Sequence, residues 1–200
     1  FGGEVFDDNW NVILDNDKHR VFLTREEYEA LVEDAKSKPQ TPAPYKVVLL
    51  AAQYEGQLEE GRALITGQLT IEVLEDGLFA LPLEIAGVGI RSATLDGKPA
   101  ALVRQKSQTQ LLLQGKRTHT LELKLTTPLQ TSAAQQTLQF AVPASVATRM
   151  KLTVPGNVEV KGGAAVRSRT YDMAANRTEL ELLPQRGRMS IVLSLNNRLL

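Results

Sequence analysis

Apolar and polar residues alternate with a period of two over most of the chain that follows Tyr45. In residues 62–75 the odd positions are apolar or small, and most even positions are polar. Successive side chains of a strand point to opposite faces of a sheet, so this pattern predicts a long strand with one buried face and one solvated face. The same alternation recurs in residues 120–126, 138–142, 150–154 and 189–195.

Short turn motifs separate these alternating runs. Gly supplies the positive φ that tight turns require, so pairs that end in Gly between apolar runs indicate hairpins. Many short strands with almost no helix predict a mainly β protein, an antiparallel β-sandwich of immunoglobulin-like character. The turn motifs are Glu60-Gly61, Asp76-Gly77, Asp96-Gly97, Gln114-Gly115, Pro155-Gly156, Gly162-Gly163 and Arg186-Gly187.

The first 42 residues show a different pattern, which predicts a small hairpin-plus-helix unit. Residues 10–14 and 19–23 flank the polar stretch 15–18 as the two strands of a hairpin. Thr24 and Glu27 have the spacing of a helix capping box. The helix that they begin has an apolar face at Tyr28, Leu31, Val32 and Ala35, and the prolines at 39, 42 and 44 end it in an extended linker.

Sequence motifs that recur in the same order in two parts of the chain predict an internal repeat. The motif Phe79-Ala-Leu-Pro82 recurs as Phe140-Ala-Val-Pro143. We therefore expect two related tandem β units, 43–129 and 130–200, with both phenylalanines inward and both prolines at strand ends or edges. Three interpretations remain open: two separate sandwiches, two halves of one core, or similar strands and turns that arose by convergence without a duplication. The later matches pair Thr94–Gly97 with Thr153–Gly156, Leu111 and Leu113 with Leu180 and Leu182, and Leu121, Leu123 and Leu125 with Ile191, Leu193 and Leu195.

Charge is balanced over the whole chain and unevenly distributed along it. The 23 Lys and Arg offset the 23 Asp and Glu. Residues 1–100 carry 9 basic and 18 acidic side chains, whereas residues 101–200 carry 14 and 5. The basic residues form no run and no aromatic residues are interleaved with them, so nucleic acid is not an expected partner. No apolar run reaches the roughly 18 residues that a membrane helix needs, so we expect no membrane insertion.

Several motifs resemble modules of large extracytoplasmic (envelope) proteins of bacteria. They are the helix start at 21–28, Tyr54-Glu-Gly56, the Leu81-Pro82 and Val142-Pro143 pairs, the turn at 95–99 and the segment 115–123. The resemblance extends over residues 19–195. It implies β-sandwich modules in the periplasm or at the cell surface, and it assigns no catalytic residue.

Residues suited to catalysis or metal binding are few. The sequence has no Cys and only two His, His19 and His119, too few to propose a zinc site. Ser107, Ser132 and Ser168 lie in no nucleophile motif, and no glycine loop of the phosphate-binding kind opens a helix. We therefore predict no enzyme, no catalytic or metal-binding residue and no cofactor. Acidic residues are plentiful, but alternating strand acids usually face solvent; they include Glu59, Glu60, Glu72, Glu84, Glu179 and Glu181.

The leading prediction for function is a non-enzymatic structural or interaction module of a larger extracytoplasmic protein. Its partner would be another protein or other domains of the same polypeptide, which we expect to continue beyond Leu200 because the chain ends on an apolar pair. One alternative is a carbohydrate- or ligand-binding module, for which Trp10, Tyr54 and Tyr171 are candidate stacking platforms. A second alternative is an accessory domain of a hydrolase.

The acidic stretch that begins at Asp15 predicts no specific calcium site. Asp15, Asp17, His19 and Glu26 occupy positions 1, 3, 5 and 12 of an EF-hand spacing, but Arg20 stands where the loop requires Gly. We expect calorimetric titration with calcium to show no stoichiometric site. A site of micromolar affinity that Asp15→Ala removes would contradict this prediction.

Overall fold

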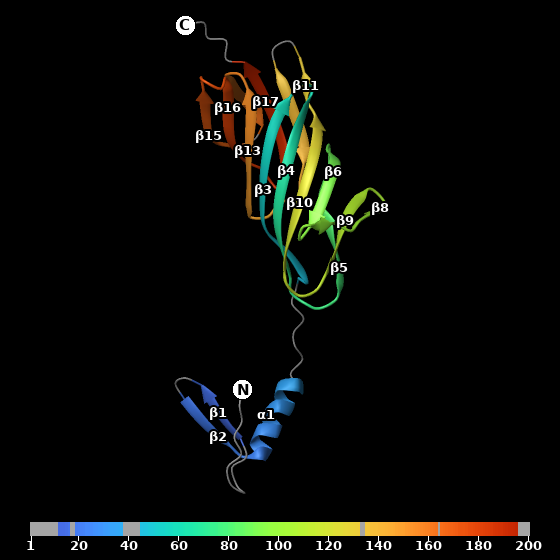
Figure 1. Cartoon of the computed structure of the whole chain (residues 1–200), viewed down its shortest axis with the longest axis vertical. Coiled ribbons are helices and arrows are strands. Elements are labelled where there is room, and N and C mark those ends of the chain that lie inside the picture. Colours follow the sequence, from blue (N-terminus) through green and yellow to red (C-terminus); the bar gives the residue numbers. More distant parts are fainter. Residues whose placement is uncertain (1–11, 17–18, 38–44, 133–134, 164, 196–200) are drawn as a thin grey trace. The chain divides into compact units, whose positions relative to one another are not determined.

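The computed structural model describes residues 12–16, 19–37, 45–132, 135–163 and 165–195. The chain divides into two compact units, 1–44 and 45–200. The boundary expected near residue 130 falls inside the second unit. The first unit holds the hairpin and the helix, and the second holds the remaining strands (Figure 1).

The N-terminal unit contains a hairpin and a capped helix, but residues 15 and 16, predicted to lie in the turn, belong to the first strand. Strand β1 (Val12–Asn16) pairs antiparallel with β2 (His19–Leu23), and α1 spans Arg25–Ser37. The Thr24 amide donates to Glu27 Oε2 at 2.9 Å, and the Glu27 amide donates to Thr24 Oγ1 at 3.3 Å. This capping box confirms the predicted helix start. Trp10, Asp17 and the side chains of Asp15, His19 and Leu31 lie outside the described residues.

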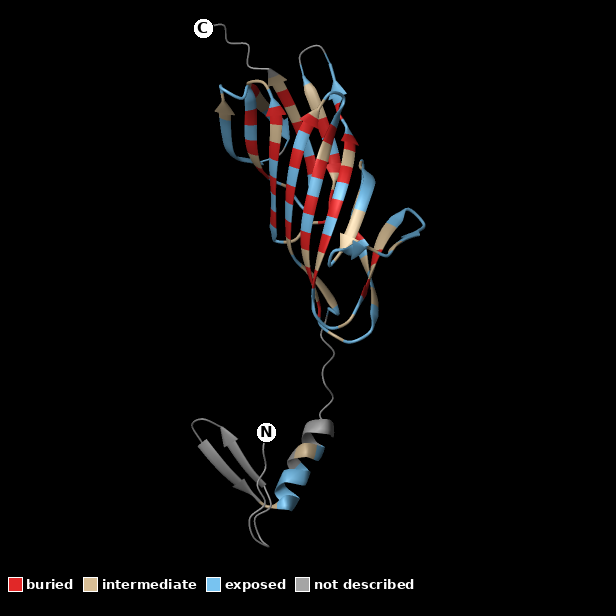
Figure 2. Ribbon diagram, viewed as in Figure 1, coloured by how far each residue is buried: buried red, intermediate tan, exposed pale blue. Residues whose placement is uncertain are grey.

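An eight-stranded sheet forms the centre of the second unit. Its order is β15-β16-β13-β3-β4-β10-β6-β7, and every pairing is antiparallel except that of β13 with β3. The long strands alternate buried and exposed residues along their length (Figure 2). The strands are β3 (Val47–Glu59), β4 (Arg62–Val73), β6 (Gly89–Leu95), β7 (Lys98–Pro99), β10 (Thr118–Pro128), β13 (Ala147–Pro155), β15 (Ala165–Asp172) and β16 (Arg177–Leu183).

Two smaller sheets contribute inward residues to the same hydrophobic core. One has the order β5-β9-β8 and the other β11-β12-β17-β14. Leu111 and Leu113 of the first sheet, and Leu138 and Ile191 of the second, belong to the core that contains Leu69 of the large sheet. The strands are β5 (Leu78–Leu83), β8 (Leu102–Gln105), β9 (Gln108–Gln114), β11 (Gln130–Thr131), β12 (Gln136–Ala141), β14 (Val158–Gly163) and β17 (Arg188–Leu195).

Tyr54 joins the large sheet to the connection between β12 and β13. It is 2% exposed, and its hydroxyl donates to the Pro143 carbonyl at 2.5 Å. Its strand partner is Gly67, where an added Cβ would lie 2.5 Å from the ring, so only glycine leaves room for the tyrosine. Burial raises the pKa of Tyr54, which keeps the hydroxyl a donor.

The mainly β, antiparallel character of the fold is confirmed, whereas the strand pairing does not reproduce the predicted repeat. Phe79 lies on β5, which pairs with the strand that carries Leu111. Phe140 lies on β12, which pairs with β17, and the strand that carries Leu180 pairs instead with β13. The matches made in chain order therefore connect strands with different partners, because pairing follows sheet topology and not sequence order.

Both prolines lie at a strand edge or beyond a strand end, as predicted. The two phenylalanines, in contrast, differ in burial. Pro82 lies on the edge strand β5, and Pro143 lies beyond the end of β12. Phe140 is 6% exposed and belongs to the core, whereas Phe79 is half-buried and packs against the core from the edge strand. The equivalence of these two rings is therefore not a property of the fold.

No helix among the described residues has the length and apolar character needed to cross a lipid bilayer.

We predict that the two phenylalanine truncations cost different amounts of stability. Phe140→Ala should lower the free energy of unfolding by about 3–5 kcal/mol, as expected for a buried ring. Phe79→Ala should cost clearly less, because that ring is only half-buried. Urea denaturation of both variants measures the difference, and equal costs would contradict it.

Candidate functional site

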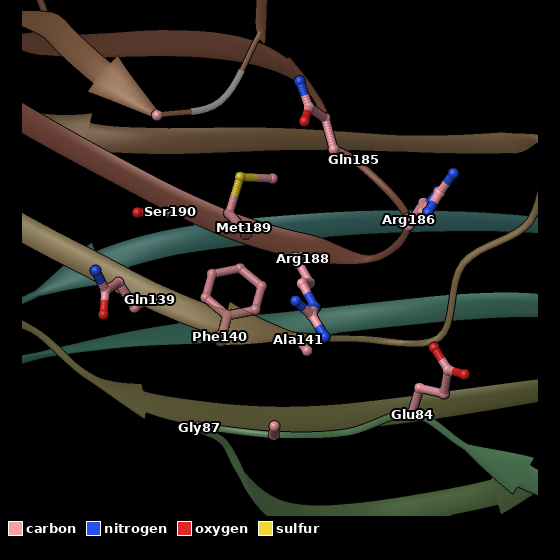
Figure 3. A pocket seen from close by; sticks show the side chains of 12 residues that line it. Glu84, Gly87, Gln139, Phe140, Ala141, Gln185, Arg186, Arg188, Met189 and Ser190 are labelled. Atoms are coloured by element: carbon pink, nitrogen blue, oxygen red, sulfur yellow. The ribbon is translucent and has the colours of Figure 1, made fainter.

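An open groove of about 1070 Å³ lies where the loop after β5 meets strands β12 and β17. Figure 3 shows the side chains that line it. Glu84 and Arg186 lie toward one end, Gln139 and Ser190 lie toward the other, and Arg188 lies between them. The lining comprises Glu84, Ala86, Gly87, Gln139, Phe140, Ala141, Gly163, Gln185, Arg186, Arg188, Met189 and Ser190.

A tight turn before β17 holds both arginines of the groove. Arg186 has a φ of 49° and Gly187 a φ of 75°, and the Arg188 amide donates to the Gln185 carbonyl at 3.0 Å. Positive φ at both central residues is typical of a type I′ turn. An added Cβ at Gly187 would lie 2.1 Å from the Val142 carbonyl oxygen, so the turn packs closely on the segment after β12. The backbone beneath the two arginines is therefore held in place.

The opposite wall of the groove is held to β12 by backbone bonds. The Ala86 amide donates to the Ala141 carbonyl at 3.1 Å, and the Ala141 amide donates back at 2.7 Å. Behind this wall the buried Thr127 hydroxyl donates to the Gly87 carbonyl at 2.8 Å. The loop after β5 thus joins the edge of the four-stranded sheet, and the groove has two backbone-supported walls.

The two arginines of the groove are charged groups without partners among the described residues. Neither Arg186 nor Arg188 has a carboxylate within 4.0 Å in that part of the chain, although Glu84 lines the same groove. By contrast, Arg62 pairs with Glu59 at 2.9 Å. The groove therefore presents uncompensated positive charge on a supported backbone.

A second, smaller hollow of about 330 Å³ lies on the outer face of the large sheet. Two of its carboxylates are paired with arginines of the protein. Arg167 contacts Glu181 at 3.0 Å, and Arg177 contacts Glu179 at 3.7 Å. A ligand there would have to compete with these pairs, so the hollow is the weaker candidate site.

The buried His119 pairs with the exposed Asp96 at the turn between β6 and β7. His119 is 1% exposed, with Nδ1 2.7 Å from Asp96 Oδ2 and Nε2 3.3 Å from the Gly115 carbonyl oxygen. Asp96 also accepts the Thr120 amide at 2.9 Å and a guanidinium N–H of Arg117 at 3.0 Å. Desolvation raises the pKa of Asp96, but these hydrogen bonds and nearby charges outweigh it and hold the pKa below its usual value.

This pair stabilises a turn and is not placed to act on a substrate. Both ring nitrogens of His119 face protein acceptors, and the ring is out of contact with solvent. A general base must reach the proton that it removes. Among the described side chains His119 is the only histidine, so the serines in that part of the chain have no histidine base within reach.

The residues proposed from the sequence occupy ordinary structural positions. Tyr54 is buried and is no platform for a sugar ring, whereas Tyr171 is half-buried and its hydroxyl donates to Asn176 Oδ1 at 3.0 Å. The Ser132 hydroxyl donates to the Gln135 carbonyl at 3.1 Å, and Ser168 contacts Glu181 at 3.5 Å. Groups of three or more His, Asp or Glu side chains that could hold a metal ion do not occur in the described part.

Sequence reasoning did not single out the arginines of the groove. Arg186 and Arg188 were only two of many scattered basic residues. The available signal was the turn motif at 186–187, which places one arginine inside a tight turn and the other directly after it.

No protein-family model and no curated protein matches the sequence. Among solved structures, an M1 zinc metallopeptidase from Deinococcus radiodurans is similar with a TM-score of 0.48 and 12% identity, over 74% of this chain and 42% of that one. Yeast LTA4 hydrolase is similar with a TM-score of 0.46 and 12% identity, over 82% of this chain and 33% of that one. The chain spans less than half the length of either protein. At these scores neither likeness argues for a shared fold or activity.

We predict that Asp96 makes this unit sensitive to acid. Its folded-state pKa is lowered, so its contribution to stability is full above the unfolded value of about 3.9 and is lost as pH falls through the folded value. The difference in melting temperature between the native protein and Asp96→Asn should therefore shrink below about pH 4.

Asp76→Asn is the matched control, because Asp76 is exposed and has no hydrogen-bond partner among the described residues. Calorimetry of the three proteins across this pH range tests the prediction. A difference that stays constant down to the lowest pH would contradict it.

Proposed function

We propose that residues 45–200 form a non-enzymatic interaction module of a larger extracytoplasmic protein, and that the groove with Arg186 and Arg188 is its contact site. The observation that carries the proposal is the pair of arginines without carboxylate partners among the described residues, both in the lining of an open groove. In this proposal the unit is a β-sandwich, which is supported by one core to which all three sheets contribute. The extracytoplasmic location rests on the resemblance of the sequence motifs.

The chemistry of the groove suits binding better than catalysis. Its polar side chains are two guanidinium groups, one carboxylate, two amides and one hydroxyl. Guanidinium groups bind carboxylates through paired hydrogen bonds and stay charged at every physiological pH. Ser190 is the only nucleophile type in the lining, and the described histidine, His119, is engaged with Asp96 and Gly115.

A carbohydrate-binding role has less support. Sugar rings stack on exposed aromatic faces, and the single aromatic residue in the lining, Phe140, is 6% exposed. An accessory domain of a hydrolase is one form that an interaction module can take. The groove would then contact another domain of the same polypeptide.

Site-specific photo-crosslinking in the native host tests this function. We expect p-benzoylphenylalanine in place of Gln139, which lines the groove, to form an adduct with another protein or with another domain of the same polypeptide. The matched control places the same group at Gln53, an exposed glutamine on the outer face of the large sheet. Intramolecular adducts are identified by peptide mass spectrometry. Equal adducts from both positions, or none from Gln139, would overturn the proposal.

A further inference from the structure

Building on this proposed function, we infer that the groove binds an acidic peptide segment, with a Glu or Asp carboxylate held between Arg186 and Arg188. The two residues occupy the second and fourth positions of one tight turn. In Figure 3 Arg188 lies in the middle of the groove beside Ala141, and Arg186 lies toward the end where Glu84 stands. Two guanidinium groups on one turn are suited to a single carboxylate or to two neighbouring ones.

The supported turn lowers the entropic cost of binding. Its backbone bond from Arg188 to Gln185 and its close contact with Val142 exist before a ligand arrives. The Val142 amide also donates to the Gly187 carbonyl at 2.9 Å, which holds the turn against the segment after β12. Because the backbone of the turn is already ordered, binding adds no cost for ordering this part of the protein backbone.

The charge of the unit attracts an acidic ligand over a longer range. Residues 45–200 contain 18 Lys and Arg and 13 Asp and Glu. A net positive unit speeds the approach of an acidic partner, and salt weakens this effect. The first 44 residues are acidic, so the positive charge belongs to the unit that carries the groove.

The rest of the lining favours a peptide over a nucleic acid. Glu84 lines the groove and can accept the N–H donors of a peptide backbone, which a phosphate backbone lacks. The Gln139 amide and the Ser190 hydroxyl, toward the opposite end from Glu84, offer donors and acceptors to peptide groups. Single-stranded nucleic acid also needs exposed aromatic faces for its bases, and the lining offers none.

Fluorescence anisotropy with a short labelled peptide of alternating Glu and Ser tests the inference. The reference is the same peptide with Gln in place of Glu, at low salt. We expect the native protein to bind the Glu peptide at least about tenfold more tightly than the Gln peptide, and added salt to narrow the difference.

The variants are chosen so that the turn is kept. Arg186→Asn is suitable because Asn tolerates the positive φ of this position better than most residues, and Arg188→Gln removes the second charge. Each should weaken binding of the Glu peptide, and together they should abolish the preference for it. Arg149→Gln removes an exposed arginine of β13 outside the groove and should leave binding unchanged. Unchanged melting temperatures establish that the variants fold.

Three results would overturn the inference: equal affinity for the Glu and Gln peptides, equal loss of binding in Arg149→Gln, or tighter binding of a DNA oligonucleotide than of the Glu peptide. The proposed function fails separately. A protein adduct from position 139 together with no preference for the Glu peptide would reject the ligand class and keep the interaction module.

Discussion

The eight-stranded sheet buries only one of its two faces, and the other sheets are arranged around this constraint. Residues such as Leu69 and Leu121 are fully buried, while their chain neighbours Gln68 and Glu122 are exposed. Apolar area on one face of a sheet must be covered by another layer. Two separate small sheets supply inward residues to that core.

The use of two covering sheets has a consequence for the candidate site. Where the loop after β5 approaches β12, the two sheets are joined by the bridge between Ala86 and Ala141. The groove lies at this junction, and its lining comes from both sides of it. A single continuous sheet would have closed the junction with ladder hydrogen bonds. The site is therefore a product of how the core is covered.

The arginines of the groove differ from Arg117 in their electrostatic pairing. Asp96 interacts with His119, Arg117 and the Thr120 amide, and these contacts stabilise the turn between β6 and β7. This pairing also neutralises the charge of Arg117. Arg186 and Arg188 lack such neutralisation among the described residues, so their charge is available to a ligand.

The sequence alone determined the local elements, and the tertiary structure decided their partners. Period-two alternation identified β4 and β10 because a half-buried strand needs that pattern at every position, and Thr24 with Glu27 marked the helix start because a capping box is local. Strand partners are not local: β13 joins β3 in parallel, and the strands of Phe79 and Phe140 pair differently despite their matching motifs. The candidate groove could not be predicted from the sequence for the same reason, because its lining residues are also distant in the chain. Glu84 and Arg188 are a hundred residues apart, and only the covering of the core brings them to one groove.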